Sequence, residues 1–144
     1  MNTRSIVFLS SLFCAHAAYS ETAPCALLSQ DQLKAVVGAN VGAASPIAQT
    51  GCSWMAAGPP KVTVTVSMQS EKMFDAVKSS SPPKTTKEAV SGVGDDAVFT
   101  GVQGFSSLWV KKGAKFLLVR IYGVPVSEAQ GKLKTLAASA VSKL

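Results

Sequence analysis

FSSLWVKKGAKFLLVRIY, residues 105–122, is the stretch that decides the fold. Side chains alternate in character on either side of Gly113-Ala114, and this period of two predicts two strands, 105–111 and 115–122, joined as a hairpin. One face of the hairpin carries Leu108, Val110, Leu117, Val119 and Ile121. The other carries Trp109, Lys111, Phe116, Leu118, Arg120 and Tyr122. The aliphatic face predicts an antiparallel sheet that buries one side under helices.

The flanking sequence supplies those helices and further strands. Ser29 and Gln32 predict a capping box for a helix that ends at Gly38, Ser70 predicts the start of a second, and Ser127 the start of an amphipathic C-terminal helix. Strands are predicted at 41–47, 52–57, 61–69 and 97–100, and the polar residues 79–87 predict a mobile loop. The fold class is therefore α+β, a two-layer sandwich in which helices pack on an antiparallel sheet of about five to six strands.

The first twenty residues predict a cleavable signal peptide. Arg4 supplies a positive charge, and residues 6–13 form an apolar run that is too short to span a bilayer. Cleavage is predicted after Ala17 or Ser20, with lipidation of Cys14 as the alternative. We expect residues 21–144 to form a single extracytoplasmic domain, periplasmic or secreted, without a stable membrane anchor.

Removal of residues 1–20 leaves two cysteines, Cys25 and Cys52. An even number in an exported chain predicts one disulfide that ties the N-terminal segment to a strand, and two unpaired thiols are the alternative. The full chain has 14 Lys and Arg against 8 Asp and Glu, a net charge of +6. Because the cations are scattered, they indicate an ordinary solvated surface, and nucleic acid is not expected as a partner.

Short motifs spread over the chain resemble those of a known family. They are Cys25-Ala26-Leu27-Leu28 before a helix that ends at Gly38, Cys52-Ser53-Trp54, residues 93–97 (VGDDA), and an Ala- and Leu-rich C-terminal helix. This pattern resembles an uncharacterised family of bacterial extracytoplasmic proteins best known as actinobacterial lipoproteins. The resemblance implies an α+β domain outside the cytoplasm with a Cys25–Cys52 bridge, and it implies no particular activity.

The residues left after cleavage restrict the possible chemistry. The one histidine, His16, lies in the leader, so histidine-based nucleophilic catalysis and ordinary zinc sites are not expected, and we predict no metal or cofactor. Asp95 and Asp96 are adjacent in a glycine-rich turn. They predict either calcium ligands or, as we prefer, an Asx-type hydrogen bond from Asp95 to the turn backbone beside a solvated Asp96.

The aromatic and basic face of the hairpin is the candidate site. Tryptophan, tyrosine and arginine dominate protein–protein contacts, so we predict a partner-binding surface made of Trp109, Lys111, Phe116, Arg120 and Tyr122. The alternative is that a loop or the N-terminal segment covers this face, which makes Trp109 a core residue.

These features favour a non-enzymatic binding protein. We expect it to act through contact with another envelope or secreted protein, as an inhibitor, an immunity factor or an accessory subunit. A carrier of a small apolar or carbohydrate ligand is the second hypothesis. A hydrolase that uses carboxylates is the third.

Overall fold

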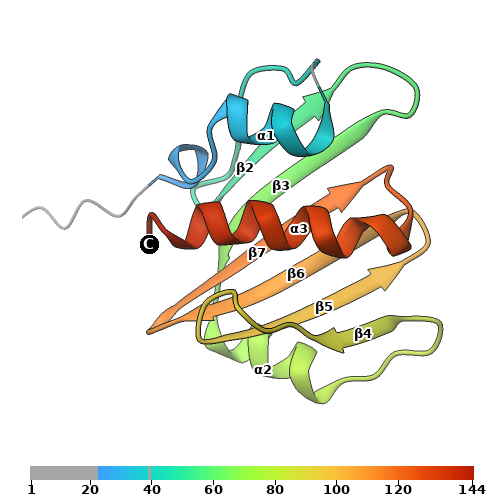
Figure 1. The fold of residues 1–144 in the computed structure, drawn as a ribbon. Helices are drawn as coiled ribbons and strands as arrows, with labels where there is room; N and C mark the ends of the chain where they lie inside the picture. The colour runs from blue at the N-terminus through green and yellow to red at the C-terminus, as the bar shows by residue number, and fades with distance from the viewer. Residues whose placement is uncertain (1–22, 39) are drawn as a thin grey trace, which may run out of the picture.

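The computed structural model describes residues 23–38 and 40–144. In this part of the chain, seven antiparallel strands form one sheet in the order β1-β2-β3-β7-β6-β5-β4 (Figure 1). The strands are β1 (Ser45–Ile47), β2 (Gly51–Ala56), β3 (Val62–Gln69), β4 (Thr86–Ala89), β5 (Asp96–Val102), β6 (Phe105–Lys112) and β7 (Lys115–Tyr122). The predicted signal peptide, with Arg4, Cys14 and His16, lies outside the described residues.

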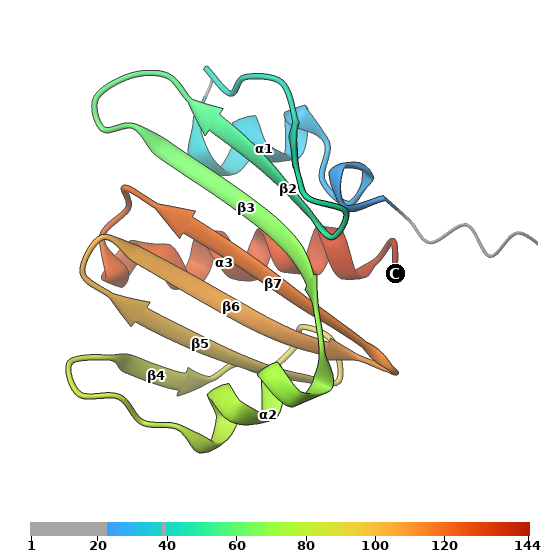
Figure 2. The ribbon, with the colours of Figure 1, turned by 180° about the vertical axis from the view of Figure 1, so that it is seen from behind.

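Helices cover both faces of the sheet, but unequally. A 3-10 turn, η1 (Pro24–Ala26), precedes α1 (Gln30–Val37), and α1 lies beside the long α3 (Val126–Val141) on one face (Figure 1). The short α2 (Glu71–Ser79) packs on the opposite face at one end of the sheet (Figure 2). The predicted α+β class, an antiparallel sheet packed by helices, is confirmed. The sheet has one strand more than the five to six expected.

The hairpin has the predicted register and the predicted faces. Lys112 pairs with Lys115 next to the Gly113-Ala114 turn, and Trp109 pairs with Leu118. The aliphatic face of the hairpin lies under α3 and belongs to the main core, to which α1 also contributes and in which Leu108, Val119 and Ile121 are fully buried. Burial of these side chains and of the apolar stripe of α3 is the principal force that holds helix to sheet.

Four local predictions meet different outcomes. The Ser29–Gln32 capping box is present, and Ser70 caps α2. The cap predicted at Ser127 is wrong, because Pro125 occupies the N-cap of α3 and makes no side-chain cap bond. The mobile loop predicted for 79–87 is wrong at its end, because residues 86 and 87 belong to β4. As an edge strand with mostly exposed side chains, β4 lacks the apolar alternation that would reveal it.

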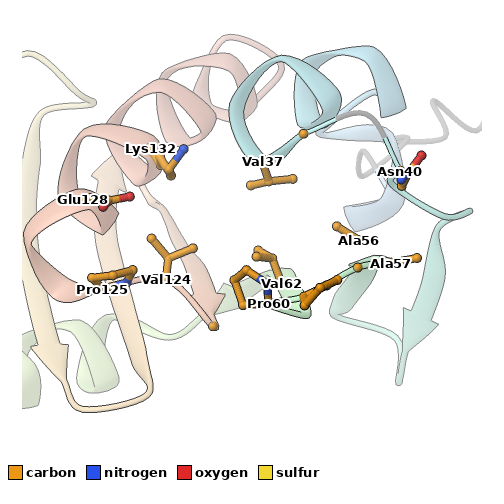
Figure 3. Close-up of a pocket in the computed structure, with 14 residues that line it drawn as sticks. Val37, Asn40, Ala56, Ala57, Pro60, Val62, Val124, Pro125, Glu128 and Lys132 are labelled. Carbon is orange, nitrogen blue, oxygen red and sulfur yellow. The ribbon is translucent and has the colours of Figure 1, made fainter.

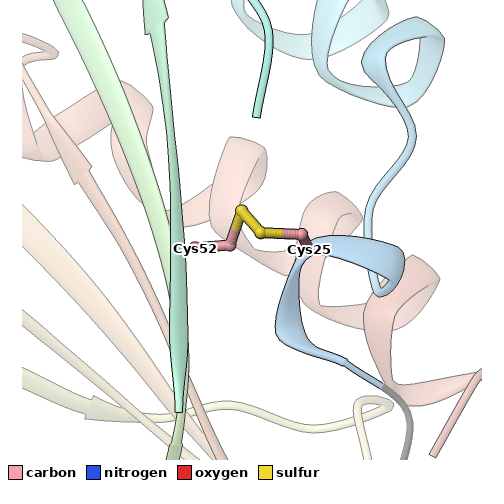
Figure 4. The surroundings of a disulfide bond; sticks show 2 residues. All are labelled: Cys25 and Cys52. Carbon is pink, nitrogen blue, oxygen red and sulfur yellow. A yellow bond between two sulfur atoms is a disulfide. The ribbon is translucent and has the colours of Figure 1, made fainter. Parts of the chain in front are cut away.

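The predicted disulfide is present and ties the N-terminal segment to the sheet. Cys25 of η1 is bonded to Cys52 of β2, with 5.0 Å between the two Cα atoms (Figure 4). Cys52 is fully buried, and Leu27 and Leu28 just after the bridge belong to the main core. The bridge therefore fixes η1 where its neighbours enter the core. In the described part of the chain, no helix is long and apolar enough to cross a bilayer.

Candidate functional site

The face of the sheet turned away from α1 and α3, which we call the second face, carries all five predicted partner-binding residues. The structure divides them into two groups. Trp109 and Phe116 are 7% and 6% exposed and form a small second core with Leu118 and with Phe74 of α2. The rings of Phe74 and Phe116 lie 5.5 Å apart. The covered-face alternative therefore describes these two residues, and the cover is α2 rather than a loop or the N-terminal segment.

Exposed charged side chains add contacts between α2 and the second face, beside the buried packing of Phe74. Lys111, the third predicted residue, forms an ion pair with Glu71 at the start of α2, with 3.9 Å between nitrogen and oxygen. Lys78, near its end, forms an ion pair with Asp96 of β5. Lys87 of β4 donates to the carbonyl oxygens of Lys78 and Ser80, where a cation also suits the negative end of the helix. Lys111 thus contributes to holding the cover.

Part of the second face is left uncovered by α2 (Figure 2). Arg120 is half-buried there and lines both hollows of this region. Its Nε donates to the buried Oγ of Ser107 at 2.8 Å, and its Nη1 lies 3.4 Å from the hydroxyl oxygen of Tyr122. The guanidinium carbon lies 5.0 Å from the centre of the Phe105 ring. These contacts fix the plane of the guanidinium and leave donors free, because an arginine has five N–H groups.

Two hollows adjoin on the second face, and Trp109 and Arg120 line both. The first, of about 180 Å³, extends toward the segment between α2 and β4 and includes Pro82, Thr100 and Phe105. The second, of about 420 Å³, extends toward β1 and β2 and includes Ile47 and Tyr122. Neither hollow has an acidic residue in its lining. Together they form an open, basic groove across the sheet.

Exposed apolar side chains gather on the same face. Among the described residues, four large hydrophobic side chains are exposed: Ile47, Met55, Met73 and Tyr122. Ile47, Met55 and Tyr122 project from the second face by strand register, and Met73 comes from α2, which packs on that face. Met55, at 67% exposed, is the most open of them. Clustering of this kind, unlike single scattered apolar residues, is typical of an interaction surface.

A separate hollow of about 310 Å³ lies at one end of the sheet, between the end of α1, the β2–β3 turn and the start of α3 (Figure 3). Val37, Val62 and Val124 supply apolar surface, and Glu128 and Lys132 project from α3 at one side (Figure 3). The Nζ of Lys132 donates to the carbonyl oxygen of Val36 at 2.8 Å, which links the two helices. This hollow carries one charge of each sign and was not predicted from the sequence.

Asp95 and Asp96 lie side by side in the chain but have different partners. One carboxylate oxygen of Asp95 accepts from the backbone N–H of Gly113 at 2.6 Å, and the other lies 3.3 Å from Lys112 Nζ. The Gly113 hydrogen bond and then Lys112 lower the pKa of Asp95. The predicted hydrogen bond to turn backbone exists, but the turn is that of the hairpin. Asp96 is paired with Lys78 rather than simply solvated.

A close approach explains the glycine-rich turn before these aspartates. A Cβ atom on Gly94 would lie 2.5 Å from the carbonyl oxygen of Lys111, and its φ is +61°. The turn therefore packs directly against β6, and a side chain at this position would separate them. Within residues 23–38 and 40–144, no three His, Cys, Asp or Glu side chains are grouped so that they could hold a metal ion.

Comparisons of this chain with protein-family models, with curated proteins and with solved structures find no match. The site is therefore argued from its own geometry.

Sequence reasoning found Arg120 and Tyr122 but missed Ile47, Met55 and Met73. Cys52 and Trp54 of β2 are buried in the main core, so the alternation along the strand predicts that Met55 points to the opposite face. The alternation alone does not show that Met55 lies near Tyr122. The strand register shows this, because Met55 pairs with Thr63 and Thr63 pairs with Tyr122. Met73 could not be assigned to this face from the sequence either, because its position depends on where α2 packs on the sheet.

Proposed function

We propose that this chain is a non-enzymatic periplasmic or secreted binding protein that acts through contact with another envelope or secreted protein, as an inhibitor, an immunity factor or an accessory subunit. The observation that carries the proposal is the clustering of the exposed large apolar side chains on the second face. The basic groove lies among them. The predicted export of residues 21–144 and the likeness to the bacterial extracytoplasmic family belong to the same proposal, and the disulfide supports it.

The contact surface consists of Ile47, Met55, Met73, Arg120 and Tyr122. Three of these are large apolar groups at the rim, and Arg120 and Tyr122 belong to the residue types that most often dominate binding energy. Trp109 and Phe116 support the surface from below, because they anchor the helix that carries Met73. The second face thus combines a buried aromatic cluster with exposed, partly apolar side chains around it.

Site-specific photocrosslinking in cells of the native host tests this proposal. A photoreactive residue at Met55 or Met73 should give one discrete crosslinked species in the envelope. The matched control is Lys134, which is exposed on α3 on the far side of the molecule. Crosslinking at Lys134 but not at Met55 or Met73, or no crosslinked species at any of the three positions, would reject the second face as the contact surface.

A second candidate function, a carrier of a small ligand, is favoured by the hollow in Figure 3. Its volume of about 310 Å³ is at the lower end of the range of small-molecule sites, and its lining combines the apolar Val37, Val62 and Val124 with the polar Asn40, Glu128 and Lys132. Native mass spectrometry of the protein purified from its host tests this function. A ligand-bound mass that disappears in Val62→Trp protein would support it, and a mass equal to the processed chain alone would count against it.

A further inference from the structure

We infer that the partner inserts an extended segment with a carboxylate side chain into the groove, where Arg120 binds the carboxylate between two apolar side chains. This inference rests on the proposed protein-contact function and specifies the chemistry of the partner. Its first support is the unmatched charge of the site. In the described part of the chain, Arg120 is half-buried in the groove and has no carboxylate within 4.0 Å, a property that it shares with several exposed lysines but that here leaves a charge unpaired between two hollows.

The linings of the two hollows strengthen this argument. They contain two cations, Arg120 and Lys87, and no aspartate or glutamate. Lys87 already donates to two carbonyl oxygens at the end of α2, so its charge is partly offset there. Among the described residues, the hydrogen-bond and ring partners of the Arg120 guanidinium are two hydroxyl groups and the Phe105 ring, none of which carries a charge. A partner that carried its own cation here would meet repulsion, whereas a carboxylate would complement the site.

The orientation of Arg120 suits a carboxylate in particular. Ser107 Oγ accepts from Nε, and the Phe105 ring lies against the guanidinium. Together they hold the fork in one plane, with the Nη2 group free of any partner among the described residues. A carboxylate pairs with such a fixed fork through short, charge-assisted hydrogen bonds. Ser107 is therefore a positioning residue for Arg120.

The hollows on either side of Arg120 indicate which side chains the partner's segment carries next to the carboxylate. Trp109, Val102 and Phe105 give apolar surface to one, and Ile47, Leu118 and Tyr122 to the other. In an extended chain every second side chain points the same way. A segment with the pattern apolar–x–acidic–x–apolar therefore directs one apolar side chain to each hollow and the carboxylate to Arg120.

A matched pair of peptides tests this inference. One is a blocked peptide containing Leu-Ser-Glu-Ser-Leu, and the other has glutamine in place of the glutamate. Titration into isotopically labelled protein, followed by amide chemical shifts, reports both the Kd and the location of binding. We expect shifts at Ser107 and Thr65 and a Kd at least tenfold lower for the glutamate peptide, because a hydrogen bond to a charged group contributes more than one to a neutral group.

Variants of Arg120 supply the decisive comparison. Arg120→Gln should remove the preference for glutamate, Arg120→Lys should retain part of it, and Lys134→Gln, on α3, should leave it unchanged. Equal affinity for the two peptides, a preference that survives in Arg120→Gln, or no shifts on the second face with either peptide would overturn the inference. Crosslinking from Met55 that persists in those cases would leave the proposed contact function in place, and absence of crosslinking would reject that function itself.

Discussion

Removal of the Cys25–Cys52 bridge should lower the free energy of unfolding by an amount that follows from the length of the loop that the bridge closes. The bridged residues are separated by 27 positions, and closure of a loop of that length corresponds to about 3.5 kcal/mol of unfolded-state entropy at 25 °C. The native contacts near the bridge are otherwise retained, because Leu27 and Leu28 are buried by apolar packing. The double variant Cys25→Ala with Cys52→Ala should therefore fold and be less stable.

Equilibrium urea unfolding measures this loss. With a slope of about 1.5 kcal/mol per molar urea, the midpoint should fall by about 2 M relative to the oxidised protein. Alanine is preferred to serine because Cys52 is fully buried, and a hydroxyl placed there would add a cost of its own. Reduced wild-type protein is the control and should match the double variant closely.

The refuting result is a loss below about 1 kcal/mol in both the variant and the reduced protein, against the value expected from loop closure. It would mean that the N-terminal segment is already held against β2 in the unfolded ensemble, or that it is not held there in the folded state. Hydrogen exchange at Leu27 and Leu28 separates these two cases, since the second predicts rapid exchange with the bridge intact.

Three further changes test separate parts of the structure. Phe74→Ala should reduce the free energy of unfolding by about 3 to 4 kcal/mol, because it empties the centre of the second core; a loss below about 1 kcal/mol in urea unfolding would mean that α2 does not cover this face. Ser106 has a fully buried hydroxyl without a hydrogen-bond partner among the described residues, so Ser106→Ala should stabilise the protein by about 1 kcal/mol, and a lower melting temperature would contradict this. For Asp95, the Gly113 hydrogen bond and Lys112 lower the pKa below its ordinary value of 3.8. Its contribution to stability is therefore present above that value and is lost as the pH falls through the folded-state pKa. Asp95→Asn should be less stable than wild type near about pH 6, and the difference should shrink as the pH falls below 3.8; a difference that does not shrink in acid would contradict the assignment.

Local patterns in the sequence predicted the hairpin, the faces of its strands and the two capped helices. These features depend on contacts between residues that are close in the chain, such as the Ser29–Gln32 capping box and the alternation along β7. The disulfide could be predicted for another reason, since an even number of cysteines in an exported chain predicts pairing. The register between distant strands does not follow from local patterns.

The parts that the sequence did not predict depend on tertiary position. Nothing local places α2 over Trp109, because its docking depends on the packing of Phe74 against Trp109 and Phe116, which are distant in the chain. Nothing local distinguishes Arg120 from the other cations either. Its distinction is its position between two hollows without acidic residues, beside Ser107 and Phe105, and the sheet alone brings these neighbours together.

Oxidative footprinting of the methionines tests the central claim, that the second face is the surface on which a partner binds. Met55 and Met73 are 67% and 48% exposed, whereas Met68 is partly buried against the main core. When envelope extract of the native host is added, Met55 and Met73 should become protected from oxidation, and the acetylation of Lys134 on α3 by an amine-reactive reagent, followed in parallel samples, should not change. Protection of Lys134 while Met55 and Met73 react at the rate of the free protein would contradict the account.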